Sequence, residues 1–354
     1  MQELFKATLA DGRQTSVMMA DDLKDLARHM GEYGRNVMWV FDTHTAKLFT
    51  QLPPYNVVLE SGEANKNING LMRIISMAAD SGMARDSRII GFGGGVVCDM
   101  AALAASVYMR GCRLTLVPTT LLCMCDATLG GKTAIDFQGS KNLIGTFYPA
   151  EEVLVSTDVL RTLPDKEYHN GMGEILKHAL LSPSTDLYSY LIGHRSEILK
   201  REPKVVAQML ALSLEVKKLY IEQDPRETKG IRQMLNLGHT FGHALESMSH
   251  FGTSSHGECV AWGTCKALEA GVALEVCDRS FAEGCLKLFQ SYGYDTDYRI
   301  GRGSWIEYRE HLSHDKKKIG GKIHFVIPVK QGQCKLMPLE ESLIQRLVIQ
   351  QYSR

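Results

Sequence analysis

The sequence predicts an α/β domain with a Rossmann-like parallel sheet over residues 1–160, followed by a mostly α-helical domain over residues 161–354. Three observations support this fold class. The chain of 354 residues exceeds one typical domain, short β-branched runs alternate with helical patterns in its first half, and long amphipathic segments dominate after Leu160. A single hydrophobic core is therefore not expected.

Apolar runs of five or six residues predict the strands of the first domain. Continuous apolar runs, without the alternation of a half-exposed strand, are typical of a parallel sheet covered by helices on both faces. The predicted strands are residues 37–42, 55–60, 87–92, 113–118 and 151–156. The helical patterns between them cover residues 67–82 and 99–109.

Amphipathic segments with prolines near their starts predict the helices of the second domain. These segments are residues 165–181, 185–200, 203–223, 232–249, 257–278 and 281–290. Residues 322–329 and 333–338 are expected to form a hairpin. The two domains would then leave a cleft between them.

Composition limits the classes of partner. Lys and Arg number 40, as do Asp and Glu, so the net charge is zero and neither a nucleic acid nor a membrane is expected as a partner. The nine scattered cysteines favour reduced thiols. Because we also find no apolar run of bilayer length and no secretion signal, we expect a soluble, cytoplasmic protein.

A glycine-rich turn, Gly91-Phe92-Gly93-Gly94-Gly95, lies where a predicted strand passes into a helix. Such glycines let the backbone approach a pyrophosphate, and the helix start supplies free N–H groups and a positive dipole end. The usual dinucleotide spacing needs a third glycine at position 98, which is Cys98 here. A purely steric role for the glycines is an equal alternative, and Asp99 could cap the helix instead of binding a ligand.

Three histidines and a glutamate form a candidate metal site. His239 and His243, four residues apart, share one helical face, and His256 begins the next predicted helix. Glu174 precedes Lys177 by three residues on another helix. A carboxylate with two histidines can hold zinc and leave positions open for substrate oxygens. A bare HxxxH pair is more often ordinary helix surface, but the additional residues favour a metal; spacing does not choose which two histidines bind it.

Basic side chains beside glycines indicate an anionic ligand. Lys132 follows two glycines, and Lys141 stands between Gly139 and Gly145. We expect both segments to form phosphate-binding loops, although neither has the GxxxxGK[ST] pattern of a Walker motif. Further positive charge comes from Arg110, Lys217, Arg232 and the run Lys316-Lys317-Lys318. Each base alone, Lys318 above all, is more often a solvated surface group. Together they favour a substrate with more than one negative group.

Six motifs in order resemble the 3-dehydroquinate synthase family, the NAD- and metal-dependent cyclases of the shikimate pathway. They are SGEANK (61–66), GGGVVCD (93–99), VPTTLL to GGKT (117–133), GSKNLIGTFY (139–148), GMGEILK (171–177) and RQMLNLGHTFGHALE to HGECVAWG (232–263). A DKK segment at 315–317 adds a seventh. Small or conservative departures from the family pattern occur at Cys98, at Ala127-Thr128-Leu129, and at Gly173, where alanine is common.

The resemblance implies roles for individual residues. It implies a zinc or cobalt site formed by Glu174, His239 and His256, with His243 beside the metal. For NAD it implies contacts from Asp42, Glu63, Lys66, Gly94, Gly95, Val96, Val97, Asp99, Thr119, Thr120, Lys132 and Lys141. For the substrate it implies contacts from Asp126, Lys132, Asn142, Lys177, Lys217, Arg232, Asn236, His243 and either Lys316 or Lys317. It also implies a homodimer in which Arg110 is donated across the interface.

The implied reaction converts 3-deoxy-D-arabino-heptulosonate 7-phosphate to 3-dehydroquinate and phosphate, toward chorismate and the aromatic amino acids. It combines transient oxidation by NAD⁺, phosphate elimination, return of the hydride and an intramolecular aldol step. In this interpretation Arg232 and Lys217 pair with the carboxylate of a sugar-acid phosphate, and His243 moves protons.

Three alternatives compete with this function. A related cyclase could act on a neutral sugar phosphate, but such a substrate offers no carboxylate to Arg232 and Lys217. A metal-dependent glycerol or alcohol dehydrogenase would release NADH. A non-catalytic NAD- or metal-binding scaffold would not need the full set of substrate residues.

Overall fold

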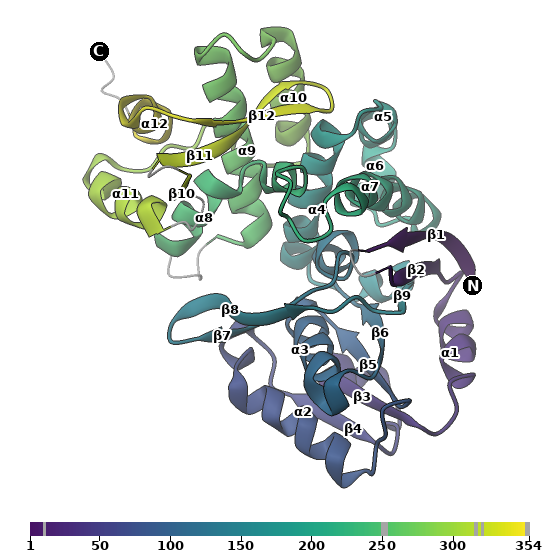
Figure 1. The fold of residues 1–354 in the computed structure, drawn as a ribbon. Helices are drawn as coiled ribbons and strands as arrows, with labels where there is room; N and C mark the ends of the chain where they lie inside the picture. Colours follow the sequence, from purple (N-terminus) through teal and green to yellow (C-terminus); the bar gives the residue numbers. More distant parts are fainter. Residues whose placement is uncertain (10–11, 249–253, 315–317, 320–321, 351–354) are drawn as a thin grey trace. The chain divides into compact units, whose positions relative to one another are not determined.

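The computed structural model describes residues 1–9, 12–248, 254–314, 318–319 and 322–350. The chain forms two compact units (Figure 1). The first comprises Met1–Tyr168 and Arg201–Leu214, and the second comprises His169–Lys200 and Glu215–Arg354. The units are thus discontinuous in sequence, and a domain boundary after residue 160 remains a prediction. Within the described residues, none of the helices combines the length and the apolar character that crossing a membrane requires.

The first unit is built on a seven-stranded sheet in the order β1-β2-β9-β6-β5-β3-β4. Its strands are β1 (Gln2–Thr8), β2 (Gln14–Met19), β3 (Val37–Asp42), β4 (Asn56–Leu59), β5 (Arg88–Gly93), β6 (Arg113–Pro118) and β9 (Glu152–Val155). β1 is antiparallel to β2, and the other neighbouring pairs are parallel. The predicted parallel sheet is confirmed, with β1 and β2 added at one edge.

Helices cover both faces of this sheet. α1 (Leu23–Gly31) buries Leu26 and Met30 in a cluster with Phe41 and Phe92 of the strands. Successive residues of a strand point to opposite faces of the sheet, so Phe92 faces α1 and Gly91 faces α3 (Gly95–Val107). A Cβ at Gly91 would lie 2.8 Å from the Cβ of Ala101 on α3. α2 (Ile68–Asp80) lies beside α3 (Figure 1). All six residues of β5 are therefore buried, which explains its continuous apolar run.

Short helical turns complete the connections of the first unit. The 3₁₀ turns are η1 (Thr45–Leu48), η2 (Glu63–Asn65), η3 (Tyr108–Arg110) and η5 (Thr157–Arg161), and η4 (Cys123–Ala127) is a π-helical turn. Four of them, η1, η2, η4 and η5, follow the carboxyl ends of β3, β4, β6 and β9, where open α/β sheets usually bind ligands.

We expected loops around Lys132 and Lys141, and this prediction was wrong. The two segments are the strands of a hairpin, in which β7 (Lys132–Phe137) pairs antiparallel with β8 (Ser140–Phe147). Gly145 serves close packing of the two strands, because a Cβ there would lie 1.9 Å from the carbonyl oxygen of Thr133. Gln138 and Gly139 both have positive φ (49° and 76°), as a two-residue hairpin turn requires.

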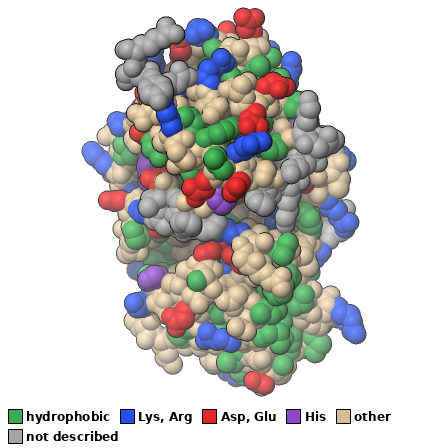
Figure 2. All heavy atoms as spheres, turned by 90° about the vertical axis from the view of Figure 1, so that its left-hand side faces the viewer, with side chains coloured by type: hydrophobic (Ala, Val, Ile, Leu, Met, Phe, Trp, Pro, Cys, Tyr) green, Lys and Arg blue, Asp and Glu red, His purple; other side chains and the backbone are tan. Residues whose placement is uncertain are grey.

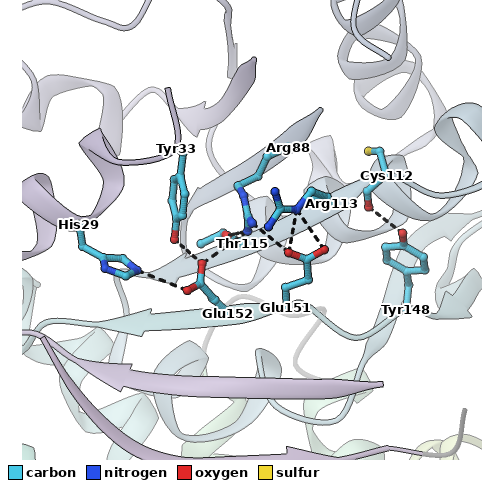
Figure 3. Close-up of polar contacts among 9 residues, drawn as sticks. All are labelled: His29, Tyr33, Arg88, Cys112, Arg113, Thr115, Tyr148, Glu151 and Glu152. Carbon is cyan, nitrogen blue, oxygen red and sulfur yellow. Dashed lines mark hydrogen bonds and ion pairs between the residues drawn. The ribbon is translucent and has the colours of Figure 1, made fainter. Parts of the chain in front are cut away.

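An ion-pair network around the buried Arg88 lies at the amino ends of β5, β6 and β9 (Figure 3). The guanidinium of Arg88 contacts Glu151 at 2.9 Å and Glu152 at 3.5 Å, donates to the Thr115 hydroxyl, and lies 4.4 Å from the Tyr33 ring centroid. Burial, and then Glu152, raise the pKa of Tyr33. Because this edge lies opposite the carboxyl ends of the strands, where such sheets bind ligands, we assign the network no part in the site.

The remaining helices and a small sheet make up most of the second unit. Its helices are α4 (Asp165–Leu181), α5 (Asp186–Gly193), α6 (Arg195–Leu199), α7 (Pro203–Gln223), η6 (Arg232–Asn236), α8 (His239–Met248), α9 (His256–Ala273), α10 (Arg279–Ser291), η7 (Arg302–Ser304), α11 (Trp305–His314) and α12 (Glu341–Val348). The sheet has the order β10 (Lys318–Ile319), β11 (Lys322–Lys330) and β12 (Gln333–Pro338). The first residues of α4 and most of α7 belong to the first unit. The predicted helical character and the late hairpin are confirmed.

Two predicted helices are interrupted. The segment 185–200 divides at His194 into α5 and α6, and the segment 232–249 begins as the 3₁₀ turn η6 before α8 starts at His239. Gly238 separates η6 from α8 with a φ of +79°, and a Cβ there would lie 2.5 Å from the carbonyl oxygen of Val260. Only glycine meets both conditions.

Candidate functional site

The glycine-rich turn joins β5 to α3 in the first unit. Gly94 precedes the first helical residue, Gly95, and no side chain caps the helix, so the N–H groups of its first turn can bond to a ligand. A Cβ at Gly93 would lie 2.6 Å from Val97, which accounts for glycine at that position. The backbone N–H of Thr119, which follows β6, donates to the carbonyl of Gly93, and Thr120 lies beside Gly94. The turn can therefore accept an anion at the start of α3.

Asp99 does not cap α3, because the helix begins four residues before it. Its carboxylate instead forms an ion pair with the buried Lys66, at 2.6 Å. The Lys66 ammonium also donates to the Oδ1 of Asn142 at 2.6 Å. Burial raises the pKa of Asp99 to about 6, although Lys66 opposes this shift. Three predicted site residues from distant segments thus meet at one point.

The other predicted residues of the first unit surround the carboxyl ends of its strands. Asp42 ends β3, and its Oδ1 accepts from the backbone N–H groups of His44 and Thr45 at 2.9 and 2.8 Å. Glu63 lies in η2 and Asp126 in η4, and both negative charges raise the pKa of Asp99, so they are near it. Lys132 and Lys141 lie on the hairpin, and Lys132 is exposed.

The candidate metal centre lies wholly within the second unit. Glu174 on α4 is fully buried, and its Oε1 lies 3.4 Å from the Nε2 of His239 on α8 and 3.4 Å from the Nε2 of His256 on α9. The same Oε1 is buried without a hydrogen-bond partner. An orphaned carboxylate oxygen facing two imidazole nitrogens is the donor set that a zinc or cobalt ion requires. These residues therefore fit a divalent cation.

Neighbouring groups hold the three side chains in place. The Lys177 ammonium donates to the other oxygen of Glu174, one helical turn away. The Nδ1 of His239 contacts the carbonyl of Leu237 at 3.1 Å, and the Nδ1 of His256 contacts the carboxylate of Glu246 at 3.1 Å. Each imidazole therefore directs its Nε2 toward Glu174.

The pKa values of His239 and His256 are shifted in opposite directions. Burial, followed by the charge of Lys177, lowers the pKa of His239 well below its usual value. Burial would also lower the pKa of His256, but the carboxylates of Glu174 and Glu246 raise it to about 10. Burial opposes ionisation of Glu174 as well, yet Lys177 and the histidines lower its pKa. A cation at Nε2 would have to displace a proton from His256.

His243 lies one turn after His239 on α8. Its ring centroid is 5.1 Å from that of His239 and 5.8 Å from that of His256. The histidine spacing left open which two bind a metal, and the arrangement around Glu174 favours His239 and His256, with His243 beside them. The i, i+4 pair is thus not the pair that faces the carboxylate.

Backbone contacts at glycines bring the ligand-bearing helices together. The N–H of Gly257 donates to the Asn170 side chain at 2.7 Å, and a Cβ at Gly257 would lie 1.8 Å from the Asn170 carbonyl oxygen. A Cβ at Gly173 would lie 2.3 Å from the Gly257 carbonyl oxygen, so glycine rather than alanine suits that position here. A Cβ at Gly242 would similarly meet the Cys259 carbonyl oxygen at 2.6 Å. These contacts fix α9 against both α4 and α8.

A second polar cluster lies around the loop after α7. The buried carboxylate of Asp224 accepts N–H groups from Thr228, Lys229, Ile231 and Arg232 at 2.8–3.1 Å. The Arg232 guanidinium is buried and donates to the Pro225 carbonyl at 2.6 Å. The amide of Asn236 donates to Glu227 at 3.0 Å, and Lys217 is buried on α7. Asp224 thereby shapes the loop that presents Arg232.

Sequence reasoning missed Glu246, Asp224 and Glu227 as members of these clusters. Glu246 follows His243 by three residues, a spacing that places both on one helical face and could have found it. Glu227 is a non-glycine residue with a φ of +57°, which no sequence pattern reveals.

Arg110 is exposed on η3, where Met109 and Arg110 have positive φ values of 51° and 63°. Two consecutive left-handed residues are uncommon outside glycine, and such strain is concentrated at functional segments. Lys316 and Lys317 lie outside the described residues.

Comparison with known proteins gives concordant results. Family models described as 3-dehydroquinate synthase N-terminal and C-terminal match residues 56–170 and 171–318. A 3-dehydroquinate synthase of Dictyoglomus thermophilum is 36% identical over 283 residues, covering 79% of this chain and 78% of that protein. One of Solibacter usitatus is 35% identical over 293 residues, covering 82% and 81%.

Among solved structures, the crystal structure of 2-deoxy-scyllo-inosose synthase with carbaglucose-6-phosphate, NAD+ and Co2+ is similar to this chain, with a TM-score of 0.84. The two chains are 22% identical, and the match covers 97% of this chain and 98% of that one. At this identity the likeness establishes a shared fold.

Proposed function

Because this chain belongs to the 3-dehydroquinate synthase family, we propose that it converts 3-deoxy-D-arabino-heptulosonate 7-phosphate to 3-dehydroquinate and phosphate, a step of the shikimate pathway. The observation that carries this proposal is the buried Glu174, whose unpaired Oε1 faces two histidine nitrogens. A buried carboxylate oxygen without a hydrogen bond is costly, and a bound cation removes that cost.

Glu174, His239 and His256 would hold zinc or cobalt, divalent metals that a mixed carboxylate and imidazole set suits. The first N–H groups of α3, at Gly94 to Val97, would hold the pyrophosphate of NAD, with Thr119 and Thr120 beside them. Asp42, at the end of β3, would contact a ribose through the oxygen that its own turn leaves free. When bound, NAD⁺ would exchange a hydride with the substrate carbinol, and the cation would polarise that carbinol oxygen.

Lys66, Glu63, Asp99 and Lys141 complete the proposed nucleotide contacts. Lys66 also positions Asn142, since its ammonium donates to the Asn142 amide oxygen. That bond leaves the NH₂ group of Asn142 to donate to a phosphate, together with Lys132 and Asn236. Asp126 would contact the substrate from η4.

Arg232 and Lys217 would pair with the substrate carboxylate. Both are buried, so a bound carboxylate would be held where water screens charge weakly. This pair favours a sugar acid over the neutral sugar phosphates that related cyclases use. Lys177 holds Glu174, and His243 lies where it could accept or return a proton at a carbinol beside the cation. One of Lys316 and Lys317 would add a further positive group.

We also propose a homodimer in which Arg110 reaches the site of the partner subunit. The β7–β8 hairpin exposes Phe137, Leu143, Ile144 and Phe147 by 39–45%, and α2 exposes Ile68 and Met72. Figure 2 shows hydrophobic side chains gathered on the lower right of the face that it draws. Monomeric proteins seldom expose such patches, and a second copy would cover this one. Nine free cysteines, eight of them buried, suit a reducing cytoplasm.

The test is an assay of phosphate release by the purified protein with the sugar-acid phosphate. We expect release without a net rise of absorbance at the NADH wavelength, because the cofactor is regenerated in each turnover. A chelator should abolish release and zinc or cobalt should restore it. Glucose 6-phosphate and sedoheptulose 7-phosphate are the controls. Turnover of either in preference to the acid, or net NADH formation, would contradict the proposal.

A further inference from the structure

Glu246 lies on the face of α8 that carries His239 and His243, at positions i, i+4 and i+7. We propose that Glu246 is a positioning residue: its carboxylate fixes the ring of His256 in the orientation and tautomer that present Nε2 to the cation. This inference rests on the proposed function, since it assigns a supporting group to the same metal centre.

The contacts of the His256 ring carry the argument. Its Nδ1 lies 3.1 Å from the Oε2 of Glu246, and its Nε2 lies 3.4 Å from the Oε1 of Glu174. The two nitrogens leave an imidazole ring in diverging directions, so each serves a different partner. With a proton on Nδ1 donated to Glu246, the lone pair remains on Nε2, the nitrogen that faces Glu174 and His239.

His239 provides an internal comparison. Its Nδ1 contacts the carbonyl oxygen of Leu237 at 3.1 Å, and its Nε2 faces the same Oε1 of Glu174. Both histidines therefore have an acceptor behind the ring, but only His256 has a charged one. A carboxylate acceptor strengthens the imidazole as a ligand, and loss of such groups in metalloproteins typically lowers metal affinity by about 10- to 100-fold.

The position of His256 explains why it needs this support. His256 is the first residue of α9, and the capping side chains of Ser255 and Glu258 bond to each other's backbone, not to the ring. The side chain of His256 is 28% exposed, whereas that of His239 is 11% exposed. Glu246, whose side chain is 10% exposed, supplies the fixed contact that packing does not.

A direct role for Glu246 as a ligand is the main alternative, because His243, Glu246 and His256 also lie close enough to share an ion. In that arrangement His256 would turn its Nδ1 to the ion. The buried Oε1 of Glu174 would then remain without a hydrogen bond, at the cost of one unsatisfied carboxylate oxygen. The arrangement around Glu174 gives that oxygen the cation and keeps Glu246 on the Nδ1 of His256, and it is therefore favoured.

Cobalt binding in the absence of substrate tests the proposal. The full-length protein, stripped of metal, would be titrated with Co²⁺ against a competing chelator, and its visible spectrum recorded. We expect Glu246→Ala to weaken cobalt binding about 10- to 100-fold and Glu246→Gln, which keeps an acceptor of the same shape, to weaken it less. The spectrum of the saturated protein should remain that of the parent, because the ligands are unchanged. Glu258→Gln, at the same helix start, is the matched control and should bind cobalt like the parent.

Each other outcome overturns the inference. Cobalt affinity within about twofold of the parent in both Glu246 variants would remove any positioning role, since such roles typically exceed tenfold. An altered cobalt spectrum would make Glu246 a ligand, and an equal loss in Glu258→Gln would reduce the effect to disturbance of the helix start. If Glu246→Ala fails to fold by circular dichroism, the isosteric glutamine variant decides. A parent that binds no cobalt would overturn the proposed function as well, whereas normal phosphate release with unaffected Glu246 variants would overturn the positioning role alone.

Discussion

Asp99 is subject to two opposed influences, and their balance predicts how pH affects stability. Burial raises its pKa to about 6 from the usual 3.8, despite the neighbouring Lys66. Asp99 therefore binds its proton more tightly in the folded state, which adds to the free energy of unfolding. This stabilisation is complete below pH 3.8 and is lost as the pH rises through about 6. The free energy of unfolding, measured by urea denaturation, should be compared between the parent and Asp99→Asn at each pH. The parent's value minus the variant's value should fall by about 3 kcal/mol from pH 3.5 to pH 7. A difference that grew with pH would show that Lys66 dominates instead.

Arg232 should determine affinity for the acid without affecting the metal. It is buried beside a loop that Asp224 organises, and it lies outside the Glu174 cluster. Loss of a charged hydrogen bond of about 1.5–3 kcal/mol predicts that Arg232→Ala raises KM about 10- to 100-fold. Arg232→Lys keeps the charge without the fork and should be intermediate. Metal content should match the parent in both variants, and a variant that lost its metal would contradict the carboxylate role.

At the scale of elements, the crossing of α4 and α9 should control metal binding. A Cβ at Gly257 would lie 1.8 Å from the Asn170 carbonyl oxygen, so Gly257→Ala must separate the helices that carry Glu174 and His256. Overpacking of this kind costs about 1–3 kcal/mol, and we expect cobalt affinity to fall at least about tenfold. Gly193→Ala is the control, because no atom lies within 4 Å of its added Cβ. Equal cobalt affinity in the two variants would refute the role of this crossing.

Elements buried on both faces could be predicted from sequence, while those of mixed exposure could not. β5 is buried at all six positions and reads as a continuous apolar run. β1 and β2 alternate buried and exposed residues at the sheet edge, and this weaker pattern was missed. β8 is exposed along most of its length, so Gly139 and Gly145 on either side of Lys141 suggested a loop, although Gly145 serves a close strand contact.

The residue types of the candidate site could be predicted from the sequence, but not which side chains contact one another. The spacing of His239 and His243 indicates a shared face, yet it cannot say that His256 faces Glu174 from another helix. That arrangement depends on how closely α4, α8 and α9 approach at Gly173, Gly242 and Gly257. Similarly, the contact of Lys66 with both Asp99 and Asn142 joins segments up to 76 residues apart.

At the scale of the whole molecule, the remaining question is whether one chain completes a site by itself. Arg110 projects from a strained, exposed turn, and it forms no hydrogen bond or ion pair with the residues that the structure describes. Among the described residues, Arg110 therefore has no partner that would give it a structural role. The adjoining exposed side chains of Val107 and Met109 are consistent with an interface at this turn.

Mixed dimers should reveal whether Arg110 acts across the interface. Homodimers of Arg110→Ala should be inactive because the arginine is missing, and homodimers of His239→Ala because a metal ligand is missing. In a mixed dimer the subunit with intact His239 receives Arg110 from its partner, so one of the two sites is complete. Random assortment from equal coexpression makes about half of the dimers mixed, which predicts about a quarter of the parent's specific activity. If Arg110 served its own chain, the arginine variant's subunits would stay inactive in every pairing and coexpression would restore nothing.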